Sequence, residues 1–363
     1  MKSFDLVVLG LSLSSSWGNG HATTYRALLK AYAAKGRRIL FLERDQPWYA
    51  ANRDLHAPDF CELAFYRSLD ELAGFRDVIA GARAVMVGSY VPDGVDVSKF
   101  IQAAARGVVA FYDIDTPVTL ARLEKNDCPY LTPELIPGFD LYLSFTGGPT
   151  LGRIERDYGA QAARALYCAV DPSAYRPLEI ASRFDLGYLG TYAEDRQPIL
   201  EELLIEPARR APDFIFAVAG PLYPDDIDWP ENVLRIDHIP PDEHAAFYGE
   251  CRFTLNVTRQ DMVRAGFSPS VRLFEAAACG TPIISDAWEG IEALFAPGDE
   301  ILIGRSADDV LHALHDVSKP ERISMANRAR SRVLGAHTAA HRANELAQYI
   351  AAAERQPAAA ALA

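Results

Sequence analysis

The sequence predicts an α/β protein with two doubly wound domains facing a cleft. Short apolar runs typical of buried parallel strands recur along both halves of the chain, and segments with helical spacing separate most of them. At 363 residues the chain has the length of about two domains. A polar segment with two prolines, residues 171–177, lies between the two series of strands and is interpreted as the linker.

The first elements form a strand–helix–strand unit. Residues 4–10 and 38–43 are apolar runs, and parallel strands need a crossover helix between them. A loop of small and polar residues at 12–20 leads into a helical pattern at 21–32, which supplies that crossover. Further strands of the first half are expected at 84–88, 108–113 and 139–145.

The second half repeats this pattern. The residues after 307 are mostly helical, and strands are expected at 184–190, 214–220, 233–236, 253–257 and 282–285. A second doubly wound domain is therefore the simplest interpretation.

Composition and charge exclude several classes of function. The hydrophobic and charged fractions, 49% and 23%, are those of a soluble globular protein. A net charge of −13 disfavours nucleic-acid binding, and no apolar run is long enough to predict a transmembrane segment. Five scattered cysteines without a C-x-x-C pair predict no structural zinc site, and reduced thiols fit a cytoplasmic location.

Polar side chains follow the expected strands of the first half. Ligands of open parallel sheets bind beyond the carboxyl ends of the strands. His21 opens a helix, where an imidazole tends to stay neutral and can act as a base, with capping or packing as the alternative. Asp113 or Asp115 is expected to bind acceptor hydroxyls or act as a base. Pro117 indicates a tight turn, which disfavours reading the two aspartates as a metal-binding D-x-D motif.

The loop at 12–20 is not a dinucleotide-binding fingerprint, because Thr23 stands where the third glycine would be. We expect no cofactor there. Trp17 and Tyr90 lie in expected loops, where an aromatic face can stack on a sugar or a base.

The strongest functional signal is the block at 268–285. Ser268 or Ser270 is expected to cap a helix whose first amides and dipole favour an anion. Arg272 in its first turn makes either a surface salt bridge or a bidentate phosphate contact. Glu275 lies deeper, and a carboxylate is rarely buried without a partner, which paired ribose hydroxyls would provide.

Two glycine-containing loops accompany this block. Gly190 lets the backbone approach a ligand, so that Thr191 and Arg196 can contact a diphosphate, unless the segment is an ordinary strand-to-helix turn. Gly220 ends the next strand in the same way. His238 follows a further strand and either borders the nucleotide base or lies on the surface.

These motifs resemble the retaining GT-B glycosyltransferases of the group 1 type and, more narrowly, the bacterial CgeB-like (spore maturation protein) glycosyltransferases. The resemblance covers residues 4–350 and rests on residues 18–21, 111–117, 187–192, 219–221, 268–285 and 288–290.

The resemblance implies a GT-B fold of two Rossmann-like domains. An acceptor-side domain is expected at 1–175 and a nucleotide-sugar-binding domain at 180–335, with a helix at 336–355 that crosses back to the first domain. It further implies a transferase that needs no metal and moves a sugar from a nucleotide diphosphate sugar, with UDP as the expected nucleotide, to an acceptor hydroxyl.

By the same resemblance, Glu275 is the ribose-binding carboxylate, and helix dipole and basic side chains stabilise the leaving diphosphate. The remaining expected donor-site residues are Gly190, Thr191, Arg196, Gly220, His238, Ser268, Ser270 and Arg272. On the acceptor side we expect Trp17, Gly20 and Tyr90, with His21, Asp113 and Asp115 as catalytic candidates.

One departure from the group 1 pattern leaves questions open. Those enzymes usually carry a Glu-x7-Glu pair, and Phe267 occupies the earlier position here. The donor sugar and the stereochemistry of transfer are therefore open, as is the acceptor, which is a glycan, a protein or a small molecule. An epimerase-like enzyme and a non-catalytic nucleotide-sugar-binding or scaffold protein remain alternatives.

Overall fold

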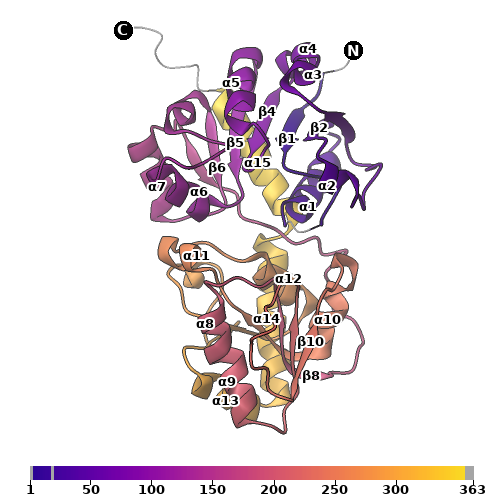
Figure 1. Cartoon of the computed structure of the whole chain (residues 1–363), viewed down its shortest axis with the longest axis vertical. Coiled ribbons are helices and arrows are strands. Elements are labelled where there is room, and N and C mark those ends of the chain that lie inside the picture. The colour runs from indigo at the N-terminus through magenta and orange to yellow at the C-terminus, as the bar shows by residue number, and fades with distance from the viewer. Residues whose placement is uncertain (1–2, 18–19, 356–363) are drawn as a thin grey trace. The chain divides into compact units, whose positions relative to one another are not determined.

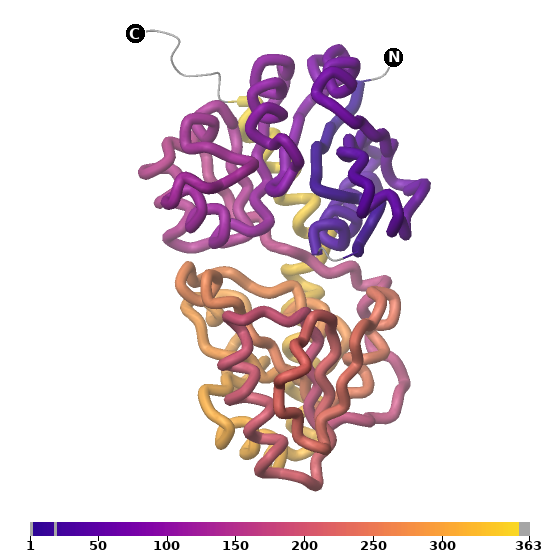
Figure 2. The backbone as a smooth tube through the Cα atoms, in the orientation of Figure 1, coloured from indigo at the N-terminus to yellow at the C-terminus, as the bar shows by residue number. Residues whose placement is uncertain are grey.

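The computed structural model describes residues 3–17 and 20–355, which form two compact units. Unit 1 comprises the chain up to Ala169 and again from Ala339 onward, and unit 2 comprises Val170 to Thr338. Figure 2 shows that the chain passes from unit 1 to unit 2 once and returns once. Tyr175 is buried within unit 2, so the segment expected as a linker at 171–177 is part of that unit.

Unit 1 is built on a parallel sheet whose described strands have the order β3-β2-β1-β4-β5-β6-β7. The order reverses between β1 and β4, and such a reversal is where ligands bind in open α/β sheets. The strands are β1 (Leu6–Gly10), β2 (Ile39–Arg44), β3 (Glu62–Tyr66), β4 (Ala84–Gly88), β5 (Val108–Asp113), β6 (Leu141–Ser144) and β7 (Ala163–Ala165).

Both faces of this sheet are covered, because successive strand residues point to opposite sides. Leu6 and Val8 pack with helices α1 (His21–Ala33) and α15 (Ala339–Glu354), while Val7 and Leu9 belong to the core on the other face. That second core takes residues from α3 (Leu69–Ala73), α4 (Arg76–Ala80), α5 (Gly94–Ala104), α6 (Thr116–Glu124), η1 (Pro133–Gly138) and α7 (Pro149–Tyr158). The short helix α2 (Pro47–Ala50) follows β2.

The helix expected at 336–355 forms as α15, drawn in yellow within unit 1 (Figure 1). Ala343, Leu346 and Ile350 are buried against the sheet. The Arg83–Glu354 ion pair (2.7 Å) lies near the end of this helix.

Unit 2 contains a second parallel sheet, with the described order β10-β9-β8-β11-β12-β13 and a reversal between β8 and β11. Its strands are β8 (Phe184–Leu189), β9 (Phe216–Ala219), β10 (Val233–Ile236), β11 (Cys251–Asn256), β12 (Ile283–Ser285) and β13 (Leu302–Ile303). The expected strands of both halves form, and the sequence did not predict β3, β7 and β13, which are short or lie at sheet edges.

Helices again flank the sheet of unit 2. One core contains residues of α8 (Gln197–Leu200), η2 (Glu201–Ile205), α9 (Glu206–Arg210) and α13 (Ala307–Asp316). Outside that core, α12 (Val271–Cys279) packs on α10 (His244–Glu250) and α14 (Lys319–Ala336). The remaining helical segments are η3 (Pro241–Glu243), α11 (Gln260–Ala265) and η4 (Ile291–Ala293).

Candidate functional site

Two arginines gather beyond the carboxyl ends of β8 and β11. Arg196 precedes α8, is only 8% exposed and donates a hydrogen bond to the Thr191 carbonyl. Its Nε is buried and has no partner among the described residues. Burial lowers the pKa of Arg196, and the charge of Arg272 lowers it further. Two neighbouring guanidinium groups that repel each other make a site for an anion.

Arg272 reaches this site from the first turn of α12. Its Nη1 donates a hydrogen bond to the Ser270 hydroxyl (3.2 Å). Its Nη2 lies close to Gly190, because a Cβ built on that glycine would be 3.1 Å from Nη2. Within residues 3–17 and 20–355, neither Arg196 nor Arg272 forms a salt bridge with a carboxylate. The surface salt bridge considered for Arg272 is therefore not present in the described residues.

The loops after β8 and β9 meet backbone to backbone. Gly220 has φ +147°, and a Cβ there would lie 2.1 Å from the Gly190 carbonyl oxygen. Only glycine fits at Gly220. Tyr223 donates a hydrogen bond to the Gly190 carbonyl (3.1 Å), and Arg235 donates one to the Gly220 carbonyl (3.1 Å). Each loop is therefore held by a side-chain hydrogen bond to its backbone.

The start of α12 distinguishes the two serines expected as caps. Ser270 is the N-cap, with its hydroxyl accepting from the Arg272 amide (3.4 Å). Ser268 instead donates to the Gly266 carbonyl (2.9 Å) and holds the preceding loop. In that loop Phe267 has a left-handed φ of +46°, fixed by a hydrogen bond from its amide to the Glu289 carbonyl (2.6 Å).

Glu275 lies one turn further along α12 and is 3% exposed. Tyr248 of α10 donates to its Oε2 (3.2 Å). A carboxylate can accept about four hydrogen bonds, so this contact leaves it capacity for a ligand. His238, by contrast, is exposed in the loop after β10.

Unit 1 carries a separate polar pair at its own strand reversal. His21 is the first residue of α1, and its Nε2 lies 2.9 Å from Asp115 Oδ2. A carboxylate only accepts, so Nε2 carries the proton. His21 is 7% exposed, whereas the Asp115 side chain is 42% exposed. Asp115 is thus the member of the pair that a ligand can touch.

Asp113, expected as an alternative to Asp115, is completely buried. Thr119 and Tyr142 each donate to its carboxylate (both 2.6 Å). Burial raises the pKa of Asp113 to about 6. Because a carboxylate with no exposed surface cannot meet a substrate, the geometry favours Asp115 over Asp113 as a catalytic candidate.

The acceptor-side aromatics differ in environment. Tyr90 has a left-handed φ of +61° and packs edge-on against His21, with ring centroids 5.5 Å apart. Trp17 is 59% exposed, and Gly20 precedes α1. The motif residues Gly18 and Asn19 lie outside the described residues.

Glu43 has no free acceptor position with which to serve as the ribose-binding acid of a dinucleotide site. It is completely buried at the end of β2, where such sites place a ribose-binding acid. Its carboxylate accepts from the amides of Leu13 (2.6 Å) and Ser14 (2.8 Å) and from the hydroxyls of Ser12 and Ser14. These contacts fill the acceptor positions of Glu43.

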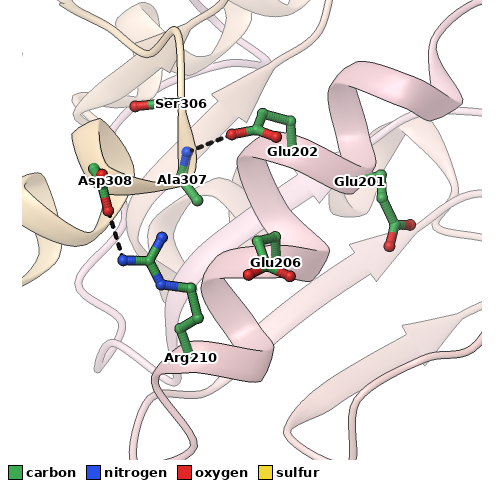
Figure 3. A pocket seen from close by; sticks show the side chains of 7 residues that line it. All are labelled: Glu201, Glu202, Glu206, Arg210, Ser306, Ala307 and Asp308. Atoms are coloured by element: carbon green, nitrogen blue, oxygen red, sulfur yellow. Dashed lines mark hydrogen bonds and ion pairs between the residues drawn. The ribbon is translucent and has the colours of Figure 1, made fainter.

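A shallow pocket of unit 2 lies apart from these groups (Figure 3). Among the residues lining it, Glu202 accepts from the Ala307 amide (2.9 Å) and Arg210 pairs with Asp308. Its glutamates, Glu201, Glu202 and Glu206, would repel a diphosphate. The described residues contain no cluster of three metal-ligating side chains and no helix long and apolar enough to cross a membrane.

Residues 196–348 match a family model described as glycosyl transferase-like. No curated protein sequence matches the chain.

Solved structures resemble the chain over nearly its whole length, among them the three described next. Sucrose-phosphate synthase from Thermosynechococcus elongatus has a TM-score of 0.68 at 14% identity, covering 95% of this chain and 98% of that one. Anabaena Alr3699/HepE in complex with UDP and glucose has a TM-score of 0.68 at 12% identity, covering 96% and 100%. A UDP-forming α,α-trehalose-phosphate synthase from Burkholderia xenovorans, in complex with glucose-6-phosphate, has a TM-score of 0.62 at 12% identity, covering 95% and 100%. These likenesses show the fold.

Proposed function

We propose that the chain, which has the GT-B glycosyltransferase fold with a glycosyl transferase-like segment in unit 2 and α15, transfers a sugar from a nucleotide diphosphate sugar to an acceptor hydroxyl, with UDP as the nucleotide. The observation that carries the proposal is the pair Arg196 and Arg272, two cations without a carboxylate partner in the described residues, placed beside the glycine loops and the start of α12. The sequence resemblance to CgeB-like enzymes supports the same activity.

The donor would bind in unit 2. Arg196, Arg272 and the first amides of α12 would stabilise the diphosphate as it leaves, which removes the need for a metal ion. Glu275 would accept hydrogen bonds from the ribose hydroxyls. The bound UDP of Alr3699/HepE is in accord with this choice of nucleotide.

The acceptor would be activated in unit 1. As its oxygen attacks the anomeric carbon, its proton passes to the exposed Asp115, and the bond to the diphosphate breaks. His21 acts as a positioning residue that holds Asp115 through Nε2.

The five cysteines are free thiols, which fits a reducing compartment such as the cytoplasm.

Calorimetric titration with UDP, GDP and dTDP in the presence of EDTA tests the donor site. We expect selective binding of UDP that Glu275→Ala weakens about tenfold or more, with the exposed Glu292→Ala as the matched control. Absence of binding to all three nucleotides by folded protein would contradict the proposal. Turnover of a UDP-sugar without an acceptor would instead favour an epimerase-like enzyme, and binding without turnover a scaffold.

A further inference from the structure

One arginine of unit 1 has no carboxylate partner, although it lies near the pair formed by His21 and Asp115. Arg122 belongs to the last turn of α6 and is partly buried. The acidic side chains at the two ends of α6 have other partners, since Asp115 pairs with His21 (2.9 Å) and Glu124 pairs with Arg153. In the described part of the chain, Arg122 forms no salt bridge.

A shortage of acidic residues does not explain this. The sequence has 49 acidic and 36 basic side chains, so a carboxylate is more abundant than a cation. Other arginines of unit 1 are paired, for example Arg26 with Asp54 and Arg44 with Asp93. A partly buried guanidinium without a counter-ion is costly in the empty protein and gains when an anion binds.

Tyr90 connects Arg122 with the polar pair. The guanidinium carbon of Arg122 lies 6.0 Å from the centroid of the Tyr90 ring, and the same ring packs edge-on against His21. Tyr90 follows β4 with a left-handed φ of +61°, a conformation that bulky residues rarely adopt. Such outliers cluster at functional sites, and this one sets a single ring against both His21 and Arg122.

Helix geometry limits the distance between the base and the cation. Asp115 is the N-cap of α6, and Arg122 follows two turns later, so the two residues lie on one side of the helix with roughly 10 Å of helix axis between them. Long side chains on a helix lean toward its N-terminus, which directs Arg122 back toward Asp115. A ligand that reaches both groups therefore carries its anion within about 10 Å of the atom that meets Asp115.

We propose that Arg122 and Tyr90 form a subsite of unit 1 for an acceptor that carries an anionic group, a carboxylate or a phosphate. Arg122 binds the anion, the Tyr90 ring supports the body of the ligand, and the acceptor hydroxyl meets Asp115. Both side chains are partly exposed, so a ligand can reach them. The inference rests on the proposed function and names the chemical class of its acceptor.

The subsite resolves a conflict of charge. A carboxylate base such as Asp115 repels an anionic acceptor, and a cation on the same side of α6 offsets that repulsion. A guanidinium stays charged at every working pH and can make two parallel hydrogen bonds to a carboxylate or a phosphate. Arg122 thus binds the acceptor and takes no proton from it.

The test measures how the full chain, saturated with UDP, binds sugars that differ only at C6: glucose, glucuronate and glucose 6-phosphate, followed by the galactose and mannose series. Titration with ligand-detected NMR gives the dissociation constants. We expect an acidic member to bind about tenfold or more tightly than its neutral parent, and the tighter of uronate and phosphate identifies the anion.

Variants of Arg122 show whether this preference comes from the subsite. Arg122→Gln should reduce the preference to about twofold or less and leave the neutral sugars unchanged, whereas Arg122→Lys should retain part of it. A purely structural role would weaken neutral and acidic sugars alike. The exposed Arg106→Gln, before the amino end of β5, is the matched control and should keep the full preference.

Asp115→Asn supplies an arm that leaves Arg122 in place. This variant should keep or raise the preference for acidic sugars, because it removes a like charge. Folded protein that binds no UDP would contradict the proposed function together with this inference. In protein that binds UDP, the inference alone is overturned by equal affinity for acidic and neutral sugars, by no binding of any acidic sugar, or by a preference that survives in Arg122→Gln or is lost in Asp115→Asn.

Discussion

The two units treat the polar groups at their strand ends in opposite ways. In unit 1, Glu43 and Asp113 are completely buried, and their carboxylates are occupied by hydrogen bonds from the unit's own amides, hydroxyls and phenols. In unit 2, Arg196 and Arg272 lie side by side without a carboxylate partner among the described residues, and Glu275 has spare acceptor capacity.

The difference separates structural from functional polar groups on the same kind of sheet. A buried polar group whose hydrogen bonds are all satisfied stabilises the fold, and adding a ligand gains nothing. A charged group with unused capacity is costly in the empty protein and gains when a ligand arrives. Among the described residues, Asp115 is the exposed carboxylate candidate of this kind in unit 1, and Arg196, Arg272 and Glu275 are the candidates in unit 2.

The largest expected effect concerns Asp115. Replacing it with Asn should lower kcat about 10²–10⁴-fold, because the acceptor proton loses its base, and should leave UDP affinity unchanged. Single-turnover kinetics and calorimetry measure the two quantities. The exposed Asp127→Asn is the matched control. An equal loss of kcat in both variants, or a loss of UDP affinity in Asp115→Asn, would contradict the division of roles between the units.

Glu43→Ala tests the structural side of the comparison. It leaves the buried amides of Leu13 and Ser14 without acceptors, so the free energy of unfolding should fall by about 3 kcal/mol. Urea denaturation followed by circular dichroism measures this change. Glu124→Ala breaks an exposed ion pair with Arg153 and should cost less than about 1 kcal/mol. Similar values for the two variants would refute a special role for Glu43.

Arg272→Met tests the functional side. Removing one guanidinium should weaken UDP binding about thirtyfold, since a charge-assisted contact to the diphosphate is lost, while uridine binding should change little. The unfolding free energy should not fall, because Met relieves the repulsion with Arg196. Calorimetry with both ligands measures the contrast, and the exposed Arg305→Met is the control. Equal weakening of UDP and uridine would contradict a phosphate contact.

The smallest expected effect is a pH dependence. The pKa of Asp113 is about 6 in the folded protein, above the ordinary value near 4 that it takes when unfolded. Between these values the folded state binds more protons, so the contribution of Asp113 to stability falls as the pH rises from about 4 to 6, on the order of 1–2 kcal/mol.

Asp113→Asn should flatten that part of the pH profile in urea unfolding. Asp286, in unit 2, has a pKa likewise raised by burial to about 6 and supplies the matched variant, Asp286→Asn. Each substitution should remove only its own contribution. An unchanged profile in Asp113→Asn would show that this carboxylate does not titrate in the range.

Much of the fold was predictable because its signals are local. Buried parallel strands are short apolar runs. The helical spacing of apolar residues predicts α1 and α12, and Ser270 at a cap position marks the start of α12. The edge strand β3 escaped prediction because its apolar run, residues 63–66, is only four residues long, and most of its residues, Glu62 and Phe65 among them, are not buried. β13 has only two residues, too few for any periodicity.

The candidate donor site was predictable where helix geometry joins neighbours in sequence. Arg272 and Glu275 stand three residues apart, so they share one side of α12 whatever the rest of the chain does. The choices between Ser268 and Ser270, and between Asp113 and Asp115, depended on burial and loop conformation, which the sequence does not encode locally.

The sequence did not predict the hydrogen bonds made by Tyr175, His244 and Tyr248. They come from separate segments, and the hydrogen bonds that join them exist only once α10, α12 and the segment after Val170 have packed together. The sequence by itself determined which elements form and where chemistry-bearing residues fall within them. The tertiary structure alone decided which of those residues are saturated and which keep capacity for a ligand, because hydrogen-bond satisfaction depends on contacts between distant segments.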